Sequence, residues 1–155
     1  MRRFFVAGNW KMNHTIADAR AFMQAFIPAV RGVENVDMAV CPSYLAIPVV
    51  SDLCQPTGIK VGAQNLYWEA SGAYTGEVAP TMVKELCDYV IVGHSERRQY
   101  FGETDESVNK RLKAGLGVGL HVIVCVGETL EENEAGQTGA VVTRQIKAGL
   151  DGITA

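Results

Sequence analysis

The chain has 155 residues, of which 48% are hydrophobic, and its 14 basic and 17 acidic residues give a formal net charge of -3. This length and composition suit one ordinary domain with a sizeable core. The charges are scattered in short mixed groups, so we expect no nucleic acid and no anionic membrane surface as partners. The apolar runs are also too short to span a membrane.

The cysteines and the N-terminus both predict a cytoplasmic location. The first residues are basic and then apolar, but the apolar run breaks at Gly8, too early for a secretory signal. The cysteines show no CxxC spacing and lie in or beside apolar segments, which indicates buried thiols of a reducing compartment rather than a disulfide or zinc framework. They are Cys41, Cys54, Cys87 and Cys125.

Five short, nearly all-apolar runs rich in β-branched residues recur along the chain. Runs of this length and composition are typical of parallel strands that are buried on both faces. The strands are expected near residues 4–9, 36–41, 59–63, 89–93 and 121–126.

Helical signals separate these runs. Thr15 and Asp18 resemble a capping box that opens a helix over 16–30, in which Pro28 is expected to kink or end the regular part. Pro80 suits a helix first turn, Thr104 precedes an acidic helix start, and the last helix is expected over 137–150. This alternation predicts βα units and a parallel sheet, either a small open doubly wound sheet or part of a closed barrel.

Polar residues follow the carboxyl ends of the predicted strands, where parallel α/β folds bind ligands. They are Asn9 and Lys11 after the first strand, Gln64 and Asn65 after the third, His94, Ser95 and Glu96 after the fourth, and Glu128 after the fifth. Lys11 alone could be a solvated lysine, His94 a capped structural histidine and Glu96 a helix cap. Because a helix is expected to begin at Ser95, its dipole would disfavour an imidazolium at His94 and keep that ring neutral.

Two further features have mainly structural interpretations. Arg97 and Arg98 are expected to be structural, with one of them pairing with a carboxylate. The glycine-bounded stretch 72–77 is either an ordinary long loop or a contact arm, and it lacks the lysine and spacing of a phosphate loop.

Several strings, in order and covering essentially the whole chain, resemble the triosephosphate isomerase family. Residues 4–13 (FFVAGNWKMN) resemble that family's first strand and loop, and residues 90–98 (VIVGHSERR) resemble its fourth strand and histidine signature. Residues 62–65, 72–77 and 125–128 resemble its third strand end, its intersubunit loop and its fifth strand end.

The resemblance implies a TIM barrel that interconverts dihydroxyacetone phosphate and glyceraldehyde 3-phosphate without cofactor or metal. It implies that Asn9 and Lys11 contact the substrate, that His94 is the electrophile, and that Ser95 and Glu96 support the site. The family's own neutral histidine, which acts beside a glutamate base, is the standard example of such a pairing. The resemblance also implies that Cys125 packs beneath the site and that the loop with Tyr74, Thr75 and Gly76 crosses a dimer interface.

This chain differs from the family pattern in one important respect. The family's base is a glutamate that follows strand six, and these 155 residues contain no segment of that kind, nor the lid and later phosphate loops. We therefore expect five of eight barrel units over 1–155, with little or no activity. Two alternatives stay open: a non-catalytic βα scaffold or fragment, and a weak binder of a phosphate-like anion.

An incomplete barrel has a physical consequence for association. Strands one and five of five would be unpaired edges that are apolar on both faces, and such edges invite pairing with another chain. We therefore expect a homo-oligomer, most simply a dimer, formed through the sheet edges and the 68–78 loop.

Overall fold

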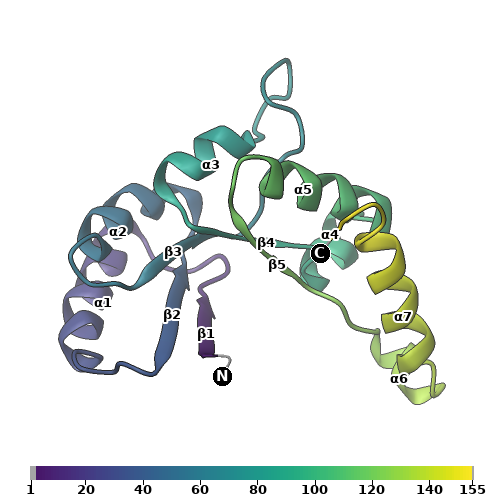
Figure 1. The fold of residues 1–155 in the computed structure, drawn as a ribbon, viewed down its shortest axis with the longest axis horizontal. Helices are drawn as coiled ribbons and strands as arrows, with labels where there is room; N and C mark the ends of the chain where they lie inside the picture. Colours follow the sequence, from purple (N-terminus) through teal and green to yellow (C-terminus); the bar gives the residue numbers. More distant parts are fainter. Residues whose placement is uncertain (1–2, 155) are drawn as a thin grey trace.

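The computed structural model describes residues 3–154, which form one curved parallel sheet with helices on its convex side (Figure 1). The strand order is β1-β2-β3-β4-β5, and every neighbouring pair is parallel. The prediction of five βα units of a TIM barrel is thereby confirmed. The strands are β1 (Phe4–Asn9), β2 (Val36–Cys41), β3 (Lys60–Ala63), β4 (Tyr89–Val92) and β5 (His121–Val124).

Several of the helices begin at a residue whose side chain caps them. α1 (Ile16–Ala29) and α5 (Asp105–Gly117) both open with complete capping boxes, at Thr15 and Thr104. Pro28 lies next to the last residue of α1, so the helix ends there instead of kinking. The other helices are α2 (Ile47–Cys54), α3 (Pro80–Leu86), α4 (Ser95–Phe101), α6 (Leu130–Glu134) and α7 (Thr138–Gly149), with a 3-10 turn at Tyr44–Ala46.

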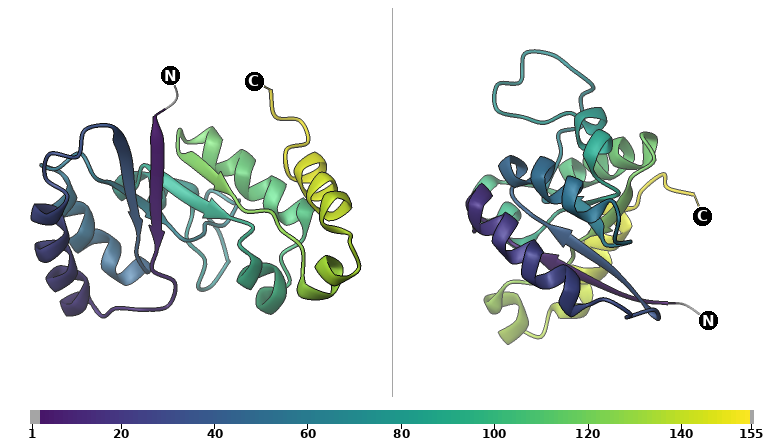
Figure 2. Two further views of the ribbon diagram at one scale, coloured as in Figure 1. Left: turned by 90° about the horizontal axis from the view of Figure 1, so that it is seen from below. Right: turned by 90° about the vertical axis from the view of Figure 1, so that its left-hand side faces the viewer.

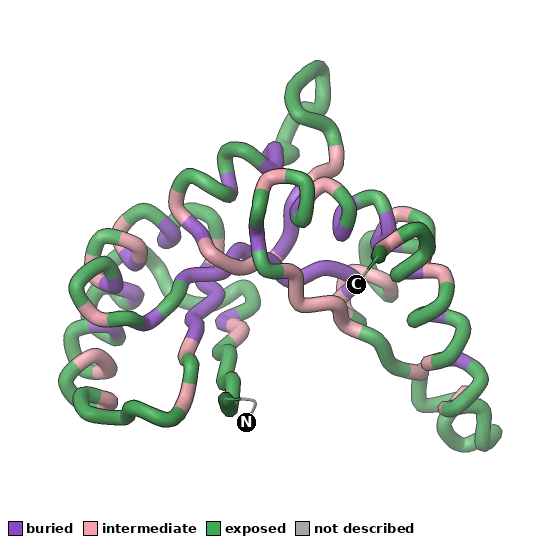
Figure 3. Tube along the Cα trace, viewed as in Figure 1, coloured by how far each residue is buried: buried purple, intermediate pink, exposed green. Residues whose placement is uncertain are grey.

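The core lies between the sheet and the helices, because alternate strand side chains point to opposite faces. Val40, Val61 and Val90 point outward and pack with helical residues such as Met23 and Val108 in one buried cluster. In Figure 3 the buried segments follow the middle strands and the inner sides of the helices, whereas β1 is exposed as far as Gly8 and only half-buried at Asn9. The five strands therefore share one core with the helices, but the outer strand β1 is poorly covered.

The loops that follow the strands gather at one end of the sheet. Figure 2 shows the arrowheads of β1 and β2 at the end of the sheet opposite the two chain termini, so the βα loops gather there. At the amino end, Phe5, Tyr89 and His121 stack on the concave side, with centroids 4.9 and 5.0 Å apart. His121 therefore lies at the end of the sheet away from the βα loops. Among residues 3–154 no helix is both long and apolar enough to cross a membrane.

Candidate functional site

The loop after β1 is bent into an unusual conformation that presents Lys11. Lys11 and His14 both have positive φ angles, 53° and 70°, which side chains other than glycine rarely adopt. The Asn9 side chain accepts a hydrogen bond from the Lys11 backbone N–H at 3.0 Å, and Asn13 donates to the Trp10 carbonyl at 2.8 Å. These two bonds close the loop on itself and fix the direction of Lys11.

Lys11 and Glu96, 85 positions apart, form an ion pair at the carboxyl ends of β1 and β4. The Lys11 Nζ atom donates to Glu96 Oε1 at 2.7 Å. This hydrogen bond is the main reason that the pKa of the Glu96 carboxyl lies below its ordinary value. Both side chains are about half exposed, so the pair is worth little in stability and serves mainly to orient the lysine.

His94 is the N-cap of α4, the helix that begins at Ser95. Its Nδ1 atom accepts a hydrogen bond from the Glu96 backbone N–H at 3.3 Å. An accepting Nδ1 assigns the proton of the neutral ring to Nε2, which is then free to donate to a ligand. Gly93 precedes it with a φ of 69°, and a Cβ atom there would lie 2.9 Å from Val108. His94 therefore leaves the strand by a turn that favours glycine.

Gln64, which follows β3, links its own strand end to the ends of β1 and β2. Its side-chain amide donates to the carbonyl oxygens of Lys11, at 2.8 Å, and Cys41, at 2.9 Å. Tyr44, which follows β2, donates its hydroxyl to the Asn65 carbonyl. Burial raises the pKa of the Tyr44 hydroxyl, so it stays protonated and keeps this bond. The first four strand ends are thus cross-linked around one opening.

That opening is a pocket of about 280 Å³. Six of the polar residues predicted at the strand ends line it: Asn9, Lys11, Gln64, Asn65, His94 and Glu96. Its wall also contains residues to which the sequence analysis gave no place in a site: Met12, Ser43, Tyr44, Arg97 and Phe101. Ser43 and Tyr44 could have been found, because they follow the end of β2 as Lys11 follows β1. The arrangement places the Lys11 ammonium and the Nε2 atom of His94 in the wall of one pocket.

Ser95 lies elsewhere. It lines a second pocket, of about 670 Å³, between the starts of α4, α5 and α6. Gln145 of α7 fixes the wall of this pocket by exchanging two hydrogen bonds with the backbone of Gly127, at 2.8 and 3.0 Å. The pKa of the Glu128 carboxyl lies below its ordinary value, first because of its own backbone N–H and then because of the hydrogen bonds that Asn133 and Thr138 donate to it.

Both arginines after His94 pair with carboxylates, one more pair than expected. Arg97 bonds to the buried Glu103. Arg98 pairs with Asp105 at 2.6 Å and donates to the Gly93 carbonyl at 2.9 Å, next to His94. Arg98 therefore braces the turn that carries His94, whereas Arg97 ties α4 to the segment that precedes α5.

Tyr74, Thr75 and Gly76 lie away from the pocket. They are exposed on the long loop between β3 and α3, which projects beyond the helices in Figures 1 and 2. Cys125 directly follows β5 and is partly buried. Its neighbours raise the pKa of its thiol through desolvation, so it stays protonated.

Comparison with known proteins gives consistent results. Residues 4–155 match the family model described as triosephosphate isomerase. The triosephosphate isomerase of Dictyoglomus thermophilum is 49% identical over 154 residues, which cover 99% of this chain and 62% of that protein. That of Endomicrobium trichonymphae is 50% identical with the same two shares.

A solved structure agrees with the sequence comparison. The crystal structure of triosephosphate isomerase from Bartonella henselae superposes with a TM-score of 0.92 at 35% identity, covering 99% of this chain and 64% of that one. The chain thus spans about 62% of the length of the curated relatives it matches.

Proposed function

The chain belongs to the triosephosphate isomerase family, and from that premise we propose that its Lys11–His94 pocket is one half of an active site for triose phosphates. The observation that carries the proposal is the convergence of Lys11, His94 and Glu96 on one pocket at the carboxyl ends of β1 and β4. Ligands of parallel barrels bind at this end of the strands. The reaction is the interconversion of dihydroxyacetone phosphate and glyceraldehyde 3-phosphate.

Each pocket residue has a role that its geometry allows. Lys11 neutralises the negative charge of the phosphate and of the enediolate, and Glu96 holds its ammonium in place through the 2.7 Å contact. His94 donates from Nε2 to the substrate carbonyl, since its Nδ1 is occupied by the Glu96 N–H. Asn9 shapes the Lys11 turn and contacts the substrate, while Ser95 supports the site from the second pocket.

Proton abstraction from carbon also needs a base, and we propose that these 155 residues alone turn over little substrate. Glu96 is bound to Lys11, and Glu128 is bound to Asn133 and Thr138. Both carboxyls have lowered pKa values, which makes each a weaker proton acceptor. The base of the complete site is therefore the glutamate that the family places after strand six.

We further propose that the chain forms a homodimer in which the 68–78 loop contacts the pocket of a second copy. Large apolar side chains are exposed at the pocket rim, with Met12 97% and Phe101 68% exposed. Thr75 lies on the exposed loop and is the residue expected to enter the pocket. The sheet edges supply a second route to association. The free thiols support a cytoplasmic location.

A coupled isomerase assay tests the activity. We expect the purified chain to show turnover no higher than its His94→Ala variant, because the base is missing from both. Turnover that is lost on the His94→Ala change would contradict the proposed lack of a base and show that a carboxylate of this chain supplies it.

Ligand binding is tested separately, by NMR. Dihydroxyacetone phosphate should shift the His94 ring signals, and Lys11→Met should weaken this binding by about tenfold or more, because the anion loses its cation. Lys113→Met, which removes a cation outside the pocket, is the matched control. No ring shift at millimolar ligand would contradict the proposed site and favour the non-catalytic scaffold.

A further inference from the structure

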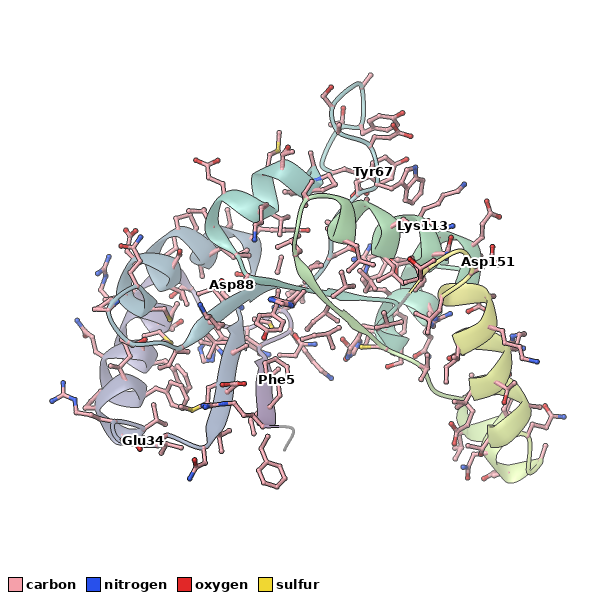
Figure 4. All side chains as sticks on the ribbon, viewed as in Figure 1. Phe5, Glu34, Tyr67, Asp88, Lys113 and Asp151 are labelled. Carbon is pink, nitrogen blue, oxygen red and sulfur yellow. The ribbon has the colours of Figure 1, made fainter. Side chains whose placement is uncertain are left out.

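The long loop between β3 and α3 stands on a continuous stack of rings and cations. The Tyr74 and Tyr67 rings lie 4.8 Å apart, and the Tyr67 and Trp68 rings lie 4.1 Å apart and nearly parallel. The Arg111 guanidinium lies over the Trp68 ring at 4.8 Å, and the Lys110 ammonium at 5.5 Å. Figure 4 labels Tyr67 at the foot of this loop, beside α5. The stack thus runs from α5 into the loop.

The α5 end of the stack is fixed. Arg111 is 5% exposed, and its Nε atom donates to Asn65 Oδ1 at 3.2 Å. Its charge is compensated by Glu103 at 3.4 Å, and a further bond joins it to the Ser107 carbonyl at 3.3 Å. Because a guanidinium is planar, these partners set the plane against which Trp68 packs.

The residues at the loop end of the stack determine the position of Thr75. The Tyr67 N–H donates to the Val78 carbonyl at 2.9 Å and closes the neck of the loop. The Tyr74 ring folds back over Gly72, where a Cβ atom would lie 2.9 Å from the ring. The Tyr74 carbonyl accepts from the Glu77 N–H at 3.0 Å. Thr75, which directly follows Tyr74, therefore has its position determined by the stacked ring.

We propose that Arg111 and Trp68 are positioning residues that hold the loop 69–77 in one conformation, so that Thr75 is ready to enter the pocket of a second copy of this chain. This inference rests on the proposed homodimer. Preorganisation of this kind raises affinity without adding a contact across the interface, because the ordering cost is met within each copy. Arg111 and Trp68 would therefore raise the affinity without touching the second copy themselves.

Hydrogen exchange on the dilute, dissociated chain tests the inference apart from the dimer. Trp68→Leu keeps an apolar side chain but removes the aromatic face, and it should speed exchange at the Tyr67 and Glu77 amides roughly tenfold. Trp68→Phe should restore most of the protection. The Val90 and Val92 amides in β4 are the internal control and should not change. Equal loop exchange in all three proteins would overturn the inference.

Sedimentation equilibrium then measures the consequence for assembly. A dimer contains two such loops, so a tenfold loss of the competent conformation in each copy should weaken dimerisation roughly 100-fold for Trp68→Leu. Thr75→Arg should weaken the dimer with loop exchange unchanged. Loss of protection without weaker association would overturn the positioning role, whereas a dimer indifferent to Thr75→Arg would overturn the proposed homodimer itself.

Discussion

At the scale of single residues, Lys11 and His14 both adopt a left-handed backbone conformation in the loop after β1, but their side chains make different contacts. The strain at Lys11 accompanies its ion pair with Glu96, but His14 has a φ of 70° and lies outside the pocket. Its ring contacts the Trp10 and Phe22 rings, at 5.1 and 5.9 Å between centroids. His14 thus combines an unfavourable backbone conformation with a favourable aromatic contact.

Two substitutions at His14 separate these effects. Both His14→Ala and His14→Gly remove the ring, but only glycine relieves the left-handed backbone. We expect the glycine variant to have a free energy of unfolding about 1 kcal/mol above that of the alanine variant. Urea denaturation followed by tryptophan fluorescence measures the difference. A glycine variant no more stable than the alanine variant would contradict a relief of strain large enough to exceed the greater entropy loss of glycine.

At the scale of elements, one capping motif opens two helices of very different importance. Thr104 caps α5, which buries Val108 and Leu112 in the shared core, whereas Thr129 caps α6, which buries no residue. Thr104→Ala should therefore lower the free energy of unfolding of the whole chain by about 1 kcal/mol. Thr129→Ala should loosen α6 alone and leave the denaturation midpoint nearly unchanged. Equal losses for the two variants would mean that α6 unfolds together with the core.

The elements with strong local signals were predictable, and the others were not. The capping box at Thr15 and the acidic helix start after Thr104 predicted where α1 and α5 begin. A helix was expected between β2 and β3, but the bounds of α2 could not be predicted because its N-cap, Ala46, forms no side-chain cap and its first four residues are all apolar. α6 has only five residues, too few for a helical periodicity to show.

The site was predictable to a similar extent. The rule that ligands bind beyond strand ends identified Lys11, His94 and Glu96. Spacing could not reveal the pairing of Lys11 with Glu96, since these residues meet only through the curvature of the sheet. Arg97 and Phe101 were missed as pocket residues because they lie inside α4, where the sequence shows only a helix.

At the scale of the whole molecule, exposure changes sharply across the sheet. The interior strand β4, which pairs with both β3 and β5, is almost wholly buried, but β1 is paired only with β2 within residues 3–154. On β1, the side chain of Phe4 is 77% exposed and that of Val6 is 59% exposed. Val6 also lines an apolar groove of about 370 Å³ between the sheet and α1. An unpaired apolar strand with a groove beside it is a template for pairing with another chain.

A single charge on β1 tests whether this edge drives association. We expect the 155-residue chain to form species larger than a dimer as its concentration rises, and Val6→Lys to suppress them, because a lysine on an edge strand opposes strand addition. Stability should change little, since Val6 is already mostly exposed. Leu130→Lys is the matched control: it places the same charge on an apolar residue that is 74% exposed on α6, far from β1, and should leave the large species intact. Sedimentation velocity across a concentration series measures both. If the two variants suppress the large species equally, net charge rather than the β1 edge controls association.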